Sequence, residues 1–184
     1  LGEYTALVAS GAVDIMEGAL LVERRGELMQ EACDMNPGTM AAILGMEEQL
    51  LSSIASDSGA YISNVNTEDQ VVISGSVESV ERTMEVASEK GAKRVIPLKV
   101  GGAFHSGLMQ PAQSGLVEAL GNANFNKADI PIVANCTGQA ITTADEIRQE
   151  LSEQIVGWVQ WKKSIEFMVE SGVTHFFEIG PGRA

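Results

Sequence analysis

Between residues 37 and 100, the hydrophobic and polar positions alternate between two patterns, one typical of β-strands and one typical of helices. Short apolar or alternating runs, as in β-strands, occur at 38–46, 60–66, 69–76 and 92–100. Between them, at 47–56 and 77–90, apolar residues recur every three or four positions, as on one face of a helix. The pattern predicts the order β-α-β-β-α-β over residues 37–100, which is the ferredoxin-like order.

The segments on either side of this block combine helices and strands. Helices are predicted at 1–10, 14–32, 107–120, 144–156 and 161–171, and buried strands at 130–136 and 173–180. Because the block interrupts this pattern, we expect a larger α/β domain formed by residues 1–36 and 101–184, with residues 37–100 inserted in it as a smaller domain.

Polar residues at three predicted helix starts are of the types that cap helices. Asp14 is followed three residues later by Glu17, a spacing that predicts a capping box. Ser76 and Thr143 are predicted to cap the helices that begin immediately after them.

Composition excludes several function classes. The formal net charge is -13, and the basic pairs do not interleave with aromatic residues, so we expect no nucleic-acid partner. No apolar run has the length of a membrane-spanning helix, so we expect no membrane partner. The two cysteines, Cys33 and Cys136, fit neither a metal site nor a disulfide framework, which favours a reducing, cytoplasmic location.

Arg25 lies where the helical pattern predicts an apolar side chain. Leu21, Leu28 and Ala32 define the apolar stripe of the helix at 14–32, and Arg25 falls inside that stripe. A buried guanidinium keeps its proton and therefore needs an anion, to which it can donate two parallel hydrogen bonds. The anion is either an internal Asp or Glu carboxylate or a carboxylate on a ligand, and the pattern leaves both open.

Gln154 is a second polar residue on an apolar face, which it shares with Ile147, Leu151 and Trp158. A buried amide of this kind must be hydrogen-bonded. Taken alone, the pattern favours a core amide that bonds to the backbone of a loop.

His105 lies between a predicted strand and a predicted helix, just after two glycines. Such junctions are where α/β proteins place reactive groups, and a neutral imidazole can act as a general base. A histidine bonded within a turn is the alternative. The other histidine, His175, lies on the last predicted strand, where we favour a structural role.

A histidine base needs a nucleophile, and the chain has no Gly-x-Ser-x-Gly elbow. Gly2 stands where the last glycine of such an elbow would stand, at the start of a predicted helix. We therefore expect the nucleophile to be the residue immediately before Leu1.

Several segments resemble, in order, the malonyl-CoA:acyl-carrier-protein transacylases. They are "LGEYTALVASGAV", "RRGELMQEA", "MAAILG", "NVNTEDQVVISG", "VGGAFHSGLMQPA", "VQWKKSIEFM" and "FFEIGPG". In that family the first segment follows Gly-His-Ser. The resemblance implies an α/β, hydrolase-like core with a parallel sheet, here incomplete, and an inserted ferredoxin-like subdomain. Acyltransferase domains of polyketide and fatty-acid synthases share the pattern, but "NVNTEDQVVISG" and "EIGPG" favour the discrete bacterial enzyme.

The resemblance also implies roles for individual residues. His105 matches the catalytic histidine, and Gln154 matches the residue whose backbone carbonyl orients it, so the role of Gln154 needs only its main chain. Arg25 matches the arginine that pairs with the malonyl carboxylate. The remaining matches are the backbone N–H of Leu1 in the oxyanion hole and, around the substrate pocket, Met29, Asn64, Asn66 and Phe104.

The implied reaction is transfer of a malonyl group from malonyl-CoA to acyl carrier protein in fatty-acid biosynthesis, without a metal or redox cofactor. Because the expected serine is not in this sequence, we expect the chain alone to be inactive. One alternative is a polyketide synthase domain, and another is a serine hydrolase of related fold, which would not need Arg25. A non-catalytic binding module on the ferredoxin-like insert is a third, but that insert lacks basic or aromatic clusters.

Overall fold

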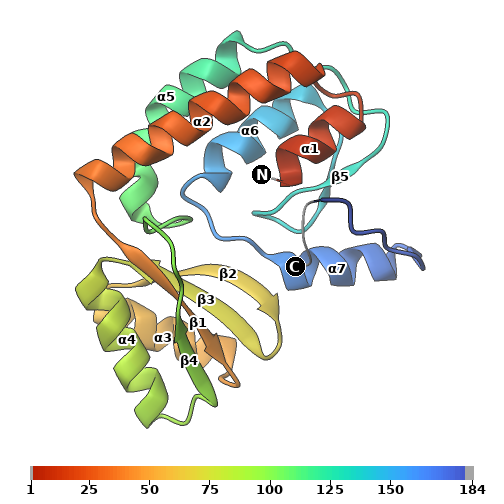
Figure 1. The fold of residues 1–184 in the computed structure, drawn as a ribbon. Helices are drawn as coiled ribbons and strands as arrows, with labels where there is room; N and C mark the ends of the chain where they lie inside the picture. The colour runs from red at the N-terminus through yellow and green to blue at the C-terminus, as the bar shows by residue number, and fades with distance from the viewer. Residues whose placement is uncertain (1, 181–184) are drawn as a thin grey trace.

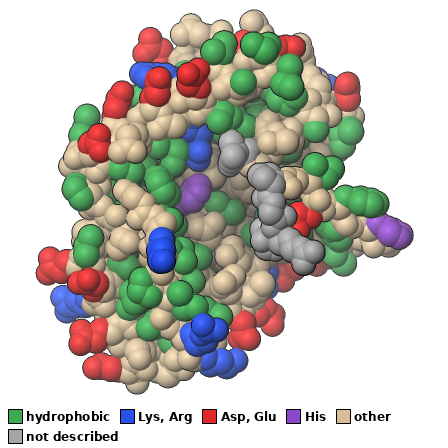
Figure 2. Space-filling view, in the orientation of Figure 1, with side chains coloured by type: hydrophobic (Ala, Val, Ile, Leu, Met, Phe, Trp, Pro, Cys, Tyr) green, Lys and Arg blue, Asp and Glu red, His purple; other side chains and the backbone are tan. Residues whose placement is uncertain are grey.

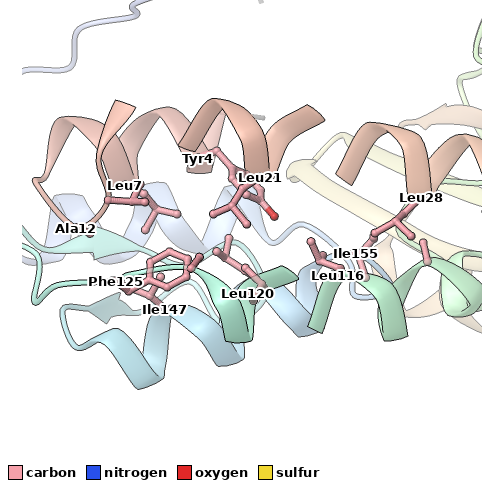
Figure 3. Close-up of a cluster of buried hydrophobic side chains, with 14 of the residues drawn as sticks. Tyr4, Leu7, Ala12, Leu21, Leu28, Leu116, Leu120, Phe125, Ile147 and Ile155 are labelled. Atoms are coloured by element: carbon pink, nitrogen blue, oxygen red, sulfur yellow. The ribbon is translucent and has the colours of Figure 1, made fainter. Parts of the chain in front are cut away.

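Four helices pack against one another in the upper part of the computed structural model, which describes residues 2–180 (Figure 1). They are α1 (Gly2–Ala9), α2 (Ile15–Met35), α5 (Gln110–Asn122), which follows the short 3-10 helix η1 (Gly107–Met109), and α6 (Ala144–Gln154). Their facing side chains form the larger hydrophobic core, with Leu21 and Leu28 of α2 opposite Leu116 and Leu120 of α5 (Figure 3). This helical part supports the residues predicted to be catalytic.

A four-stranded antiparallel sheet forms the lower part of the molecule (Figure 1). Its strands are β1 (Thr39–Leu44), β2 (Tyr61–Thr67), β3 (Gln70–Gly75) and β4 (Arg94–Pro97), in the spatial order β2-β3-β1-β4. Helices α3 (Glu48–Ser58) and α4 (Val77–Glu89) cover one face, where Leu51 and Val80 are buried against Ile73 of the sheet. The predicted ferredoxin-like order is therefore confirmed.

The three predicted helix caps are present in the structure, but one predicted capping box is not. The Ser76 hydroxyl accepts a hydrogen bond from the Ser79 N–H, and Thr143 forms a complete capping box with Glu146. Asp14 caps α2 by accepting from the Met16 N–H. The predicted capping box with Glu17 is wrong.

The Glu17 carboxylate does not bind the first turn of α2, because it accepts two hydrogen bonds from Asn124, in the loop after α5. Its Oε1 accepts from the backbone N–H of Asn124 at 2.8 Å and from the Asn124 side-chain amide at 3.3 Å. The carboxylate thus joins the start of α2 to the end of α5.

The predicted parallel sheet of the larger domain is not formed by residues 2–180. The segment predicted as a strand at 130–136 contributes only β5 (Ile132–Val133), which pairs antiparallel with β6 (Ala140–Ile141). Residues 173–180 form no strand, and their side chains are exposed; His175, predicted to lie on this strand, contacts Thr174. A strand needs a neighbouring backbone to complete its hydrogen bonds, and the described residues provide none for this segment.

The two parts of the molecule are joined along strand β2. The Val65 N–H donates to the Val159 carbonyl, and the Val159 N–H donates to the Ser63 carbonyl, just before α7 (Trp161–Glu170). The predicted division into 1–36 with 101–184, and 37–100, stays an interpretation because these bonds cross it. Within residues 2–180, no helix combines the length and the apolar character needed to cross a membrane.

Candidate active site

His105 lies in the turn between β4 and η1 and has an unusual backbone conformation. Its φ angle is 57°, and within residues 2–180 it is the one residue other than glycine with a positive φ. This left-handed region is costly for a residue with a Cβ, so the turn must be stabilised by its surroundings. The buried Ser106 provides part of this stabilisation, because its hydroxyl donates to the Ala103 carbonyl and accepts from the Leu108 N–H.

A backbone carbonyl at the end of α6 orients the His105 ring. The ring Nδ1 lies 3.1 Å from the carbonyl oxygen of Gln154. Because a carbonyl can only accept, Nδ1 carries the hydrogen and the lone pair is left on Nε2. Nε2 is therefore the atom that can take a proton from a nucleophile.

The surroundings of His105 favour its neutral form. Burial lowers the pKa of the imidazole below its ordinary 6.5, and the positive charge of Arg25 lowers it further. The bonds to the Gln154 and Gly157 backbone act in the opposite direction but do not cancel these effects. A neutral imidazole is the form that a general base requires.

Gln154 contacts both of the other two predicted residues. Its carbonyl holds His105, and its side-chain Oε1 accepts a hydrogen bond from Arg25 Nη2 at 3.2 Å. The expectation that only its main chain matters is therefore incomplete, because the buried amide fixes the guanidinium as well. Three residues that are far apart in the sequence meet at one point.

Arg25 brings a positive charge to this point without a carboxylate to balance it. The side chain is half-buried, and its Cζ lies 5.7 Å from the centroid of the Tyr4 ring. Its Nε is buried without a hydrogen-bond partner, and none of the ion pairs among residues 2–180 includes Arg25. The structure thus does not support the internal salt bridge, and the charge of the guanidinium has no carboxylate partner among residues 2–180.

A pocket of about 520 Å³ opens beside His105, between the helical part and the sheet. The space-filling view, drawn in the same orientation as Figure 1, shows a hollow near the centre of this face (Figure 2). Helix α3 and the start of β2 form one wall, and the segment at 156–158 forms the other. The volume is that of a small-molecule site.

The other residues predicted to line the substrate pocket lie in different places. Met29, one turn after Arg25, and Phe104 are half-buried against the larger core, and Phe104 also contacts the uncovered face of the sheet. Asn64 lies on β2 and bridges to Val159. Asn66 donates to Gln70 on the neighbouring strand and is not among the residues that line the pocket with His105. Leu1 lies outside the described residues.

Three aromatic residues at the site were not among the predicted site residues. Tyr61 and Trp158 line the pocket beside His105, and Tyr4 lies under the guanidinium of Arg25. Trp158 stands four residues after Gln154, so its position on the same helical face was a usable signal. Nothing in the local pattern around Tyr4 or Tyr61 indicates what each one contacts.

Comparison with known proteins identifies similar sequences over the whole chain. The family described as "Acyl transferase domain" matches residues 1–181. The malonyl CoA-acyl carrier protein transacylase of Bacillus subtilis is 42% identical over 188 residues, and the alignment covers 100% of this chain but 59% of that protein. This chain therefore spans less than two thirds of the relative's length.

Solved structures also match nearly the whole of this chain. An acyl-carrier-protein S-malonyltransferase from Bartonella henselae matches with a TM-score of 0.94 and 38% identity, covering 98% of this chain and 59% of that one. A malonyl-transacylase in complex with a type II PKS acyl-carrier protein matches with a TM-score of 0.95 and 37% identity, covering 98% of this chain and 60% of that one.

Proposed function

Because this chain belongs to the acyl transferase domain family, we propose that it is the part of a malonyl-CoA:acyl-carrier-protein transacylase that carries the general base and the carboxylate-binding arginine. Its substrate is malonyl-CoA, and its partner is acyl carrier protein. The nucleophile is the serine expected immediately before Leu1. The proposed location is the cytoplasm.

One observation carries the proposal, namely that Gln154 contacts both His105 and Arg25. The carbonyl of Gln154 is 3.1 Å from the base, and its amide oxygen is 3.2 Å from the guanidinium. A proton acceptor and a cation are thereby fixed relative to each other. This arrangement suits a substrate with a reactive carbonyl at one end and a carboxylate at the other, as in a malonyl thioester.

The reaction proceeds in two acyl transfers. His105 Nε2 removes the proton from the serine hydroxyl, and the serine oxygen attacks the thioester carbonyl of malonyl-CoA. The oxyanion is stabilised by backbone N–H groups, one of them expected to be that of Leu1. The C–S bond then breaks, and the CoA thiolate leaves as a thiol with the proton from His105.

The second transfer reverses these steps with a different thiol. His105 takes the proton of the phosphopantetheine thiol of the carrier protein, and the sulfur attacks the malonyl-serine ester. The serine leaves with the proton that His105 held. Throughout, Arg25 holds the malonyl carboxylate, which keeps the acyl group in place while CoA is exchanged for the carrier protein.

A serine hydrolase of related fold is the alternative function. It would pass the acyl group to water and would not need a cation that lacks a carboxylate partner among residues 2–180. A polyketide synthase domain would use the same chemistry, so the choice of carrier protein distinguishes it.

The experiment is an acyl-transfer assay on the protein extended upstream to include the expected Gly-His-Ser. With malonyl-CoA and acyl carrier protein, we expect malonyl-carrier protein as the product and a malonylated enzyme by intact mass spectrometry. His105→Ala should remove both, and His175→Ala, in the exposed terminal segment, should leave both unchanged. Release of free malonate as the main product would support the hydrolase instead.

A further inference from the structure

Two glutamates of the helical part are buried, one on α1 and one on α6. Glu3 has 8% of its surface exposed and Glu150 has 4%. Neither forms an ion pair with a cation among residues 2–180. Two carboxyl groups at this depth cannot both stay charged without a large cost.

The two carboxyl groups lie side by side because they bind adjacent backbone groups. Glu3 Oε1 accepts from the Asn135 N–H at 3.0 Å, and Glu150 Oε1 accepts from the Cys136 N–H at 2.8 Å. Gln160, which precedes α7, binds the carbonyls of the same two residues. The glutamates therefore connect α1, α6 and the turn at 135–136.

The second carboxyl oxygen of Glu3 lacks a hydrogen-bond donor if both glutamates are ionised. Glu3 Oε2 is buried and has no hydrogen-bond partner when both groups are treated as acceptors. An ionised carboxylate cannot donate, whereas a protonated one donates through its O–H. A single proton shared by Glu3 and Glu150 would supply the missing bond.

We propose that Glu3 and Glu150 share one proton and that this protonated pair positions the start of α1 against α6, and hence positions His105. Glu150 and Gln154 lie one turn apart on the same helix, and the Gln154 carbonyl holds the His105 ring. Glu3 lies at the start of α1, two residues after Leu1, the expected oxyanion donor, and three residues after the expected nucleophile. The role in catalysis rests on the proposed function, whereas the shared proton does not.

The pKa shifts of Glu3 and of the titratable groups near it are consistent with a protonated pair. Burial, followed by the charge of Glu150, raises the pKa of Glu3 to about 8. The N–H of Asn135 lowers this pKa, a side-chain hydrogen bond with Glu150 raises it, and the charge of the terminal amino group lowers it. Glu150 and Glu3, after burial, raise the pKa of the Cys136 thiol, with Glu153 contributing from the next turn of α6. On α1, burial raises the pKa of Tyr4 to about 12, with Arg25 of α2 opposing, so the tyrosine stays neutral where the pair titrates.

Histidine NMR on the chain itself tests the proposal, because the chain has only two histidines. The pKa of His105 is lowered, so its ring is already neutral well below pH 8. We expect its ring resonances to show a second inflection near pH 8, when the pair loses its proton. The exposed His175 serves as the internal reference and should show none.

Conservative variants identify the source of that inflection. In Glu3→Gln or Glu150→Gln the amide supplies the hydrogen that the shared proton supplied. The His105 resonances should therefore show no inflection near pH 8 from this pair. Glu153→Gln, which changes an exposed carboxylate on the same helix, should keep it. The terminal amino group also titrates near pH 8 but is present in every variant, so an unchanged inflection in both Gln variants would contradict the proposal.

A second measurement covers the case in which the Gln variants do not fold. The infrared spectrum of the unaltered chain should contain a protonated carboxyl band at neutral pH that disappears as the pH rises past about 8. Absence of that band at neutral pH would overturn the shared proton.

In the extended protein, kcat should fall above the same pH with little change in KM, and Glu150→Gln should remove the fall. A fall that persists in Glu150→Gln would contradict the positioning role. If the extended protein transfers no malonyl group at all, the proposed function fails while the NMR and infrared results still decide the shared proton.

Discussion

The backbone of His105 carries a conformational cost that its neighbours offset. A residue with a Cβ at a φ of 57° costs about 1–3 kcal/mol relative to an ordinary conformation. The Ser106 hydroxyl bonds and the contact with the Gln154 carbonyl hold the turn in this state. In this conformation the imidazole ring points from the turn toward the last residue of α6, whose carbonyl it contacts.

The protonation of His105 sets the expected pH dependence of transfer. Since burial lowers the pKa of the imidazole below 6.5, the neutral base persists to lower pH than an exposed histidine would. In the extended protein we expect the acid limb of kcat/KM for malonyl-CoA to have its inflection below pH 6.5. A pH–rate profile measures it, and an inflection clearly above 6.5 would contradict the buried, neutral base.

Residues that break a pattern were visible in the sequence, whereas residues that act through distant contacts were not. Arg25 and Gln154 were found because each is polar on an apolar helical face. Glu3 was not, because a carboxylate in the first turn of a helix is ordinary. Its contact with Asn135 joins positions 132 residues apart, and only the fold brings them together.

At the scale of elements, α6 positions the site because both of its ends are fixed. Thr143 and Glu146 form a capping box at its first turn, and Gln154 is its last residue. Buried Ile147 and Leu151 attach it to the helical core between these ends. The orienting carbonyl therefore depends on a helix whose register is set at both ends.

Removal of the cap should weaken this helix measurably. Thr143→Ala removes the hydroxyl that accepts from the Glu146 N–H, which typically costs about 1 kcal/mol of unfolding free energy. Chemical denaturation of the chain measures the change. Thr5→Ala, an exposed position inside α1, is the matched control and should leave stability unchanged or slightly higher. Equal stability of Thr143→Ala and the unaltered chain would show that the cap contributes nothing.

The elements differ in how far the sequence could predict them. The ferredoxin-like part was predictable because all four strands and both helices lie within residues 39–97 and satisfy one another. The segment at 173–180 has an apolar strand pattern, but its Phe177 and Ile179 are 85% and 90% exposed. The apolar pattern shows that the segment could form a strand, but among residues 2–180 it is paired with none.

At the scale of the whole molecule, the site is assembled where the two parts meet. The helical part supplies Arg25 and Gln154, the connection back from the sheet supplies His105, and α3 with β2 supplies a wall of the pocket. Strand β2 is hydrogen-bonded to the segment that leads into α7, which fixes the two parts relative to each other along this wall. The geometry therefore depends on both parts.

The selectivity of the extended protein for malonyl over acetyl groups, with and without Arg25, tests the account most directly. Arg25→Ala should lose malonyl transfer by an amount on the order of 2–5 kcal/mol, because a charge-assisted contact in a partly desolvated site is removed. Acetyl transfer should persist or rise, since it has no carboxylate to bind. Arg24→Ala, which removes an adjacent exposed arginine paired with Glu27, should change neither rate. Equal loss of malonyl and acetyl transfer in Arg25→Ala would contradict the assignment and make Arg25 a structural residue.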